Sequence, residues 1–200
     1  IVPAPGVYES FDDRDYRKKV SFLVETEQGG VMTPYTEWTW PRIHMAKWCL
    51  SRGENCISSD GATSDHNYNL FRYAEVLLIA AECLNEANGG PTASAYTYLN
   101  AVRARARNYE GSQTDFPADF QSGMSQAEFR AAVREERRIE LAFEWKRWFD
   151  LVRWGIAKEA FTGANSYEPH SNFQDHQVLL PLPQTELDLN PNLLPQNAGY

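Results

Sequence analysis

Aromatic side chains stand among polar ones in an irregular stretch, residues 1–69, and could bind a ligand without reacting with it. An aromatic face is flat and apolar, and polar groups beside it can satisfy the polar groups of a ligand. Prolines and glycines interrupt regular structure here, and binding residues often lie on such backbone. Residues 20–26 suit a strand, which Gly29-Gly30 would turn. In the alternative interpretation, these rings fill a small satellite core beneath a long loop. The candidate ligand-binding residues are Tyr35, Trp38, Trp40 and Trp48.

A short acidic cluster near these aromatics, Asp12, Asp13 and Asp15, could supply the two carboxylates of a glycosidase. The separation of two carboxylates across a cleft decides that chemistry, and the sequence does not disclose it. Short acidic clusters are usually solvated turns. The sequence also contains no glycine-rich phosphate loop and no nucleophile elbow. We therefore expect no catalytic residues and a protein that is not an enzyme.

The histidines do not form a recognisable metal site. They show no pairing at helical ligand spacing, and no Glu-x-x-His motif accompanies the acidic helix near the middle of the chain. Asp65, Asn67 and Asn69 copy the first alternating positions of a calcium loop, but Leu70 replaces the turn glycine and Val76 the closing glutamate. We expect no metal site and no cofactor, and calcium bound in another way stays open. The histidines are His44, His66, His170 and His176.

The bulk composition is that of a globular chain, with 200 residues, 42% apolar and 23% charged, enough for one good-sized core. The net charge of -8 argues against a nucleic-acid surface. The basic run Arg103, Arg105 and Arg107 is interpreted as a solvated or ion-paired helix end. No uncharged window has the length of a membrane helix. The chain begins at Ile1 without a leader, so we expect that a leader was removed or that this is a fragment.

Three cysteines leave at least one thiol without a disulfide partner. Cys83 lies in an apolar helical run and is expected to be a buried thiol. Cys49 and Cys56 flank a polar loop and could form a disulfide in an oxidising compartment. The sequence leaves that pairing open.

Helical periodicity begins abruptly at Leu70 and predicts a folded helical region over residues 70–200. The first helix should end at Gly89-Gly90, and a second should follow Pro91 as its antiparallel partner. Ser125 and Glu128 have the spacing of a capping box that opens a long third helix. A short helix is expected around residues 184–189, before a tail rich in Asn and Pro.

The third helix is expected to continue without a break through residues 129–154 and to form the central, buried helix of the fold. Its second half is apolar on nearly every face and would have to be covered all round. Charged residues at successive steps of three should form ion pairs along one edge, with Glu140 and Glu144 paired to arginines of the same helix. The residues interpreted as structural are Glu140, Glu144, Arg147, Trp148, Asp150 and Arg153.

Four ordered motifs then give the chain a family likeness. They are FRYAEVLLIAAECLNEANG (71–89), LNAVRARA (99–106), EERRIELAFEWKRWFDLVRWG (135–155) and the closing LLPLPQTELDLNPNLLPQNAGY. In these segments the chain resembles the SusD/RagB-like outer-membrane nutrient-binding lipoproteins of Bacteroidetes. Before Phe71 the resemblance is thin, and Trp145 stands where the family commonly has glycine.

The resemblance implies an all-α, tetratricopeptide-like scaffold with an irregular, partly extended N-terminal segment and a C-terminal tail. It also implies non-catalytic glycan binding on the extracellular face of the outer membrane, and delivery to a SusC-like TonB-dependent transporter. Flat rings suit the apolar C–H faces of sugars. The family's proteins are more than twice this long, so the chain is expected to be a C-terminal part without the lipid anchor.

Two alternatives to glycan binding stay open at this point. One is capture of peptides within the same family, for which a pocket with paired charges would be the expected feature. The other is a helical-repeat module that binds another protein, for which the helix pair after Leu70 would suffice.

Overall fold

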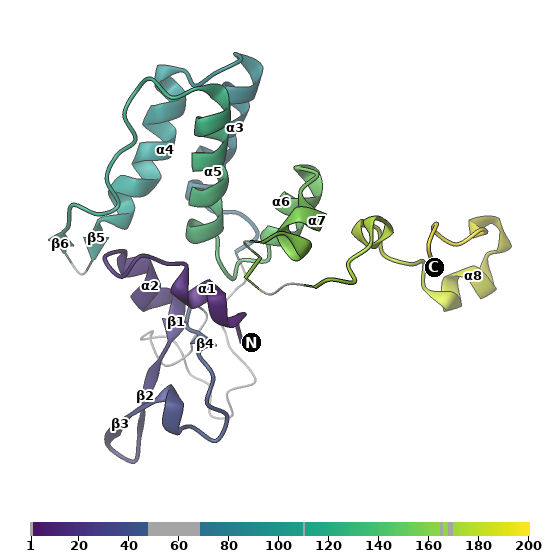
Figure 1. Cartoon of the computed structure of the whole chain (residues 1–200), viewed down its shortest axis with the longest axis horizontal. Coiled ribbons are helices and arrows are strands. Elements are labelled where there is room, and N and C mark those ends of the chain that lie inside the picture. The colour runs from purple at the N-terminus through teal and green to yellow at the C-terminus, as the bar shows by residue number, and fades with distance from the viewer. Residues whose placement is uncertain (1, 48–68, 110, 165, 168–169) are drawn as a thin grey trace. The chain divides into compact units, whose positions relative to one another are not determined.

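The structure is a computed structural model that describes residues 2–47, 69–109, 111–164, 166–167 and 170–200 (Figure 1). The chain divides into two compact units, Ile1–Lys146 and Arg147–Tyr200, and each is described by itself. Trp48, Cys49 and Cys56 lie outside the described residues, and with them the disulfide that the sequence leaves open. The sequence predicts a boundary at residue 70, between a ligand-binding segment (residues 1–69) and the helical scaffold (residues 70–200). This boundary stays a prediction.

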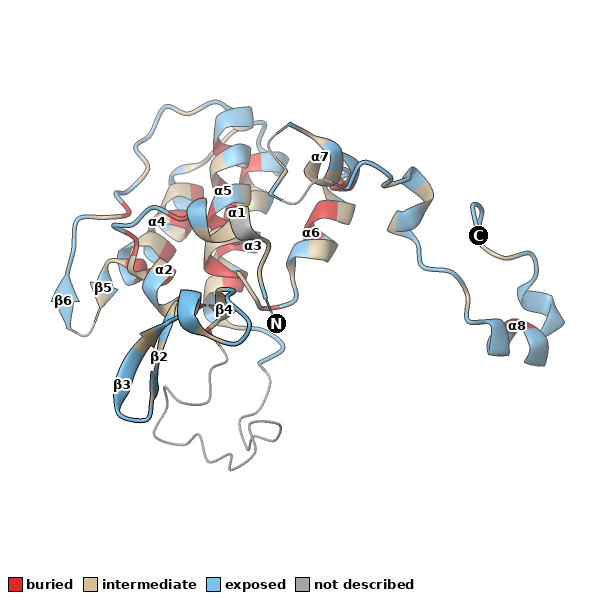
Figure 2. Ribbon diagram, turned by 60° about the horizontal axis from the view of Figure 1, so that its bottom comes forward, coloured by how far each residue is buried: buried red, intermediate tan, exposed pale blue. Residues whose placement is uncertain are grey.

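Three helices form the core of the first unit: α3 (Tyr73–Ala87), α4 (Ala93–Ala106) and α5 (Gln126–Glu140). α3 and α4 are the expected helix pair, and α5 packs against both (Figure 1). Figure 2 shows the buried residues gathered where these helices face one another. Alanines in the core allow close approach of the helices. The buried core residues are Leu78, Ala81, Ala95, Leu99, Val102, Phe129, Val133 and Leu141.

Local signals set the ends of these helices as the sequence predicts. Gly89 takes a φ of 67° after α3, a left-handed conformation that glycine adopts without strain. The Thr92 side chain accepts a hydrogen bond from the Ala95 amide and begins α4. Ser125 and Glu128 form the predicted capping box at the start of α5.

The N-terminal part of this unit contains two short helices, α1 (Pro5–Glu9) and α2 (Tyr16–Ser21), followed by short strands. β1 (Phe22–Leu23) pairs antiparallel with β4 (His44–Met45), and β2 (Glu25–Gln28) pairs with β3 (Val31–Pro34). The β2–β3 hairpin turns at Gly29-Gly30, as the sequence predicts. After it come the 3-10 helix η1 (Tyr35–Glu37) and, beyond α4, the pair β5 (Asn108–Tyr109) and β6 (Ser112–Gln113).

The prediction of one unbroken helix over residues 129–154 is wrong. α5 ends at Glu140, and α6 (Arg147–Arg153) begins after a turn in which Phe143 and Trp145 have φ values of 64° and 60°. Such left-handed conformations cannot continue a right-handed helix. The break lets the Phe143 ring contact Phe22 edge-on at 5.3 Å. Contacts with distant residues therefore override the helical pattern of the sequence.

The second unit holds α6, α7 (Ala157–Thr162), η3 (Asp175–Val178), α8 (Gln184–Leu189) and η4 (Pro191–Leu193). Its aromatic cluster is centred on Phe161, whose ring centroid lies 4.9 Å from Phe173 and 6.2 Å from Trp148. Arg153 and Asp150 form one predicted ion pair, at 2.9 Å. α8 covers the predicted residues 184–189.

Two burial predictions are corrected by the structure. The apolar stretch after Ile139 is not covered all round, because Trp145 is 60% exposed, Phe149 is 68% exposed and Trp148 is half-buried. Cys83 is an exposed free thiol, since it lies on the side of α3 that faces away from the core. The predicted all-α class, with few and short strands, is confirmed.

Candidate functional site

The segment after the β2–β3 hairpin places two of the candidate aromatics in contact. Trp38 is half-buried, and its Nε1 donates a hydrogen bond to the Thr33 carbonyl oxygen at 3.1 Å. Its ring meets Tyr35 edge-on at 6.5 Å and His44 edge-on at 5.4 Å. These contacts hold the segment against β3 and β4. Trp38 therefore has a structural role, while part of its side chain stays accessible to solvent.

Trp40, two residues further on, is 77% exposed. Its ring makes no aromatic or cation–π contact among the described residues, and its carbonyl oxygen accepts a hydrogen bond from the Arg42 amide at 2.8 Å. Thr36, Glu37 and Thr39 beside it are exposed as well. An isolated indole face next to hydroxyl and charged groups can hold an amphipathic ligand such as a sugar ring. Trp48 lies outside the described residues.

The acidic cluster near residue 13 is fully ion-paired. Asp12 pairs with Arg14, Asp13 with Lys18 and Asp15 with Arg17, each at 2.7 Å. Hydrogen bonds from the Arg14 side chain, and then from its backbone, lower the pKa of Asp12 to about 2. A general acid must hold a proton near neutral pH, which Asp12 does not.

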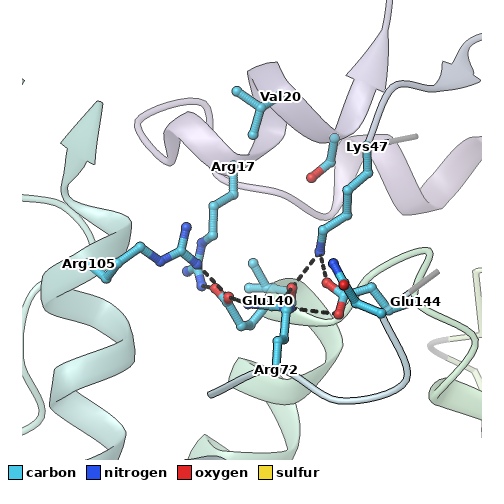
Figure 3. A pocket seen from close by; sticks show the side chains of 10 residues that line it. Arg17, Val20, Lys47, Arg72, Arg105, Glu140 and Glu144 are labelled. Carbon is cyan, nitrogen blue, oxygen red and sulfur yellow. Dashed lines mark hydrogen bonds and ion pairs between the residues drawn. The ribbon is translucent and has the colours of Figure 1, made fainter. Parts of the chain in front are cut away.

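A second constellation lies around the C-terminal end of α5, where Glu136, Glu140 and Glu144 are buried. We call Glu140, Glu144 and the four cations that line the neighbouring cavity the ionic cluster; the cations are Arg17, Lys47, Arg72 and Arg105 (Figure 3). These cations come from α2, from the segment after β4, from the residue before α3 and from α4. The fold thus brings cations from four parts of the chain to Glu140 of α5 and to Glu144 in the turn after it.

Glu140 is the centre of the ionic cluster. It accepts hydrogen bonds from Arg72 at 2.6 Å, from Arg17 at 3.0 Å and from Arg105. Burial by itself would raise the pKa of Glu140, but the positive charges around it, Arg105 first, hold that pKa below its ordinary value. Glu140 is therefore a carboxylate that stays charged inside the fold.

Glu144 pairs with Lys47 and with Arg72, whose Nε lies 2.7 Å from it. The partners of Glu140 come from other elements, so the expectation that an arginine of the same helix neutralises Glu140 is wrong. For Glu144 that expectation stays a prediction. Burial is the main cause that lowers the pKa of Lys47, and the charge of Glu144 opposes the shift. Lys47 is thus a half-buried cation that pairs with Glu144.

The ionic cluster borders a cavity of about 290 Å³. Figure 3 shows the four cationic side chains reaching toward Glu140 and Glu144, with Val20 of α2 on the opposite wall. Sequence reasoning missed this cavity, because Glu140 pairs there with arginines that lie 35 to 123 positions away along the chain. The one local signal was the basic run on α4, where Arg103 pairs with Glu136 at 2.6 Å and Arg107 with Asp119 at 2.7 Å.

In the described part of the chain, no three His, Cys, Asp or Glu side chains gather as ligands of a metal ion. Nor do the described helices include one that combines the length and apolar character needed to cross a bilayer.

Comparison with known proteins gives the family. The sequence pattern of the SusD family matches residues 4–200. The chain belongs to the SusD family. SusD-like protein P2 of Formosa agariphila is 43% identical over 207 residues, which cover 100% of this chain and 40% of that protein. The chain spans about two fifths of the length of this SusD relative.

Solved SusD structures agree with the fold. A SusD homolog from Bacteroides thetaiotaomicron superposes with a TM-score of 0.73 at 28% identity, over 94% of this chain and 41% of that one. Surface glycan-binding protein A from Bacteroides uniformis gives a TM-score of 0.64 at 29% identity, over 97% of this chain and 40% of that one. The resemblance drawn from four sequence motifs is confirmed, and it extends to the N-terminal segment, where the motifs are thin.

Proposed function

We propose that the protein binds glycans without chemical reaction at the bacterial outer surface and delivers them to a SusC-like TonB-dependent transporter. The observation that carries the proposal is the exposed indole of Trp40, which stands on a segment fastened by Trp38. Membership of the SusD family and the likeness to a surface glycan-binding protein support the same function.

The physical basis is the match between an indole face and a pyranose ring. The C–H groups on one face of a sugar form an apolar patch, and an exposed tryptophan loses unfavourable contact with water when it covers that patch. Thr36, Thr39 and Arg42, exposed and close to Trp40 along the chain, carry groups that can hydrogen-bond to hydroxyls. Because Trp38 already holds the loop, little ordering is needed on binding.

The ion pairs of the acidic cluster support binding without catalysis. A glycosidase needs one carboxylic acid and one carboxylate on either side of the bond that breaks. Each of Asp12, Asp13 and Asp15 is instead neutralised by a neighbouring cation. The proposal includes a lipid anchor and an outer-membrane location because the chain belongs to the SusD family.

The test is titration calorimetry with a panel of neutral oligosaccharides, comparing the protein with Trp40→Ala. We expect about a tenfold or larger loss of affinity, which corresponds to about 1.4 kcal/mol, because the sugar would lose the apolar face that it covers. Tyr73→Ala is the matched control, because Tyr73 is 75% exposed on α3. Equal affinity of Trp40→Ala and the unaltered protein would remove Trp40 from the site.

The peptide-binding alternative has its own outcome in the same titrations. If a short peptide binds and none of the oligosaccharides does, the result would favour peptide binding over glycan binding. The paired charges of the ionic cluster would then be the place to look for the peptide.

A further inference from the structure

The connection between α3 and α4 contains the one Asn-Gly pair of the sequence, Asn88-Gly89. Asn88 is the first residue after α3, and Gly90 and Pro91 lead from the pair toward α4. Asparagine is a chemically labile residue, because the backbone nitrogen that follows it can attack its carboxamide. Glycine in the next position leaves that nitrogen unhindered, since it has no Cβ. This connection is therefore the place in the chain to look for a covalent change.

Both reacting groups of the pair are accessible. Asn88 is exposed and has a ψ of 3°, so its backbone has already left the helical conformation of α3. Apart from its chain neighbours, no described residue has an atom within 4 Å of the position that a Cβ of Gly89 would take. The Gly90 amide donates a hydrogen bond to the Asn85 carbonyl oxygen at 3.0 Å, whereas the Gly89 amide has no acceptor among the residues that the structure describes. The nitrogen that would attack is therefore available for reaction.

One side-chain hydrogen bond opposes the reaction. The carboxamide Nδ2 of Asn88 donates to the Leu84 carbonyl oxygen at 2.8 Å, and the Asn88 backbone amide donates to the same oxygen at 3.3 Å. These bonds close the last turn of α3 and hold the carboxamide on the helix. The carboxamide must leave Leu84 before the Gly89 nitrogen can reach its carbon. Because exposed helix ends open locally at low free-energy cost, the bond slows the reaction without preventing it.

We propose that Asn88 is a site of spontaneous deamidation through a succinimide. The Gly89 backbone nitrogen, after giving its proton to hydroxide, attacks Cγ of Asn88. The bond between this nitrogen and Cγ forms, the bond between Cγ and Nδ2 breaks, and Nδ2 leaves as ammonia. Water then opens the five-membered ring at either carbonyl, which leaves aspartate or, after attack on the backbone carbonyl, isoaspartate at position 88. The reaction consumes only water and needs no ligand, so it does not depend on the proposed function.

The modification loosens the C-terminal end of α3. Both products place a negative charge at the negative end of the helix dipole, two residues after Glu86, and negative charge is unfavourable there. Both also lack the Nδ2 donor, so the Leu84 carbonyl oxygen loses a hydrogen bond. Isoaspartate adds a carbon atom to the main chain between α3 and α4. The same end of α3 supports the start of α5, because Asn85 donates to the Gln126 carbonyl oxygen at 3.0 Å.

The first experiment follows the protein during incubation at neutral and at mildly alkaline pH, with peptide mapping by mass spectrometry. The peptide that contains Asn88 should gain the mass difference between an amide and an acid, and should do so faster at the higher pH, because the deprotonated nitrogen attacks. Asn172 is the internal reference: it is exposed too, but the Phe173 amide after it donates to the His170 carbonyl oxygen at 3.0 Å. An unmodified Asn88, or equal rates at Asn88 and Asn172, would overturn the proposal.

The matched control variant is Asn88→Gln. It keeps the amide but places it one bond further from the Gly89 nitrogen, which disfavours closure of the ring. The peptide should then stay unmodified at position 88 under the conditions that modify the unaltered protein. A methyltransferase that labels isoaspartate should label the incubated protein and leave the incubated variant nearly unlabelled. Equal labelling of the two proteins would contradict the assignment to Asn88.

A second variant, Asn88→Asp, introduces the charge of the product at once and tests its effect on α3. We expect its midpoint of thermal unfolding to lie below that of Asn88→Gln, because only the carboxylate meets the negative end of the helix dipole. Raising the salt concentration should narrow the gap, since the site is exposed. Equal midpoints at low salt would contradict the loosening of the helix end.

The part assigned to the hydrogen bond with Leu84 is tested by the rate of modification. A urea concentration that leaves the protein folded should speed the reaction, because it populates the open end of α3. A free peptide with the sequence of residues 84–93 should react several-fold faster than the folded protein. Equal rates in the peptide and in the folded protein would contradict a restraint by Leu84.

Discussion

Arg72 and Glu140 meet at two points: Nη1 of Arg72 donates to the Glu140 carboxylate at 2.6 Å, and Nη2 donates to the Glu140 carbonyl oxygen at 2.7 Å. That carbonyl is among the last of α5 and has no partner within the helix. Lys47 donates to the same oxygen. Two cations thus lie at the negative end of the α5 dipole, where positive charge is stabilising. The ionic cluster therefore serves as the C-terminal cap of α5.

Arg72→Ala should destabilise the protein by about 2–4 kcal/mol, because the buried Glu140 and Glu144 would both lose a partner. Arg14→Ala is the control, since Arg14 pairs with Asp12 at an exposed position and such surface pairs contribute little to stability. Urea unfolding of both variants measures the difference. Equal losses of stability would show that the ionic cluster does not hold the fold.

Acid should weaken the contribution of Glu140. Its folded pKa lies below its ordinary 4.5, so its stabilisation is present above pH of about 4.5 and is lost as the pH falls through the folded pKa. Other carboxylates titrate in the same range, so the comparison is made with Glu140→Gln. The difference in unfolding free energy between the two proteins should shrink as the pH falls below 4.5. A constant difference would mean that Glu140 is not held as a carboxylate.

Trp145→Gly should keep or raise stability. Its φ of 60° is strained for a bulky residue and costs about 1–3 kcal/mol, whereas glycine adopts it freely. The exposed ring loses little burial in return. Phe143→Gly is the contrast, because Phe143 has a similar φ but contacts Phe22. We expect Phe143→Gly to melt at a lower temperature and Trp145→Gly at the same or a higher one. A marked drop for Trp145→Gly would show an unseen packing role.

Trp148→Ala should cost about 1–3 kcal/mol. This is less than the roughly 3–5 kcal/mol of a fully buried aromatic, because Trp148 is half-buried and contacts Phe161 on one side. Phe149→Ala, at the exposed neighbouring position, should change the unfolding free energy by less than about 0.5 kcal/mol. Chemical denaturation distinguishes these values. The reverse order of the two losses would contradict the arrangement of α6.

Local features were predictable from the sequence because neighbouring residues determine them. The capping box of Ser125 and Glu128, the turn at Gly29-Gly30 and the helix at residues 184–189 all depend on residues a few positions apart. Family membership was also predictable, since it depends on ordered motifs.

The break after Glu140 and the partners of its carboxylate were not predictable in this way. The break depends on the contact of Phe143 with Phe22, more than a hundred positions away along the chain. The strain at Trp145 does have a sequence signal, because the family commonly has glycine there. Of the candidate aromatics, composition selected Trp40 and Trp38 equally, and only the structure separates an exposed ring from a half-buried one.

The most direct measurement of the central claim is hydroxyl-radical footprinting of Trp40 with and without a bound oligosaccharide. Tyr73, equally exposed on α3, is the internal reference. Binding without reaction on the Trp40 face predicts that oxidation of Trp40 falls several-fold, that oxidation of Tyr73 does not change, and that the oligosaccharide is recovered at its original length. Unchanged oxidation of Trp40 under saturating ligand, or recovery of shortened oligosaccharide, would contradict it.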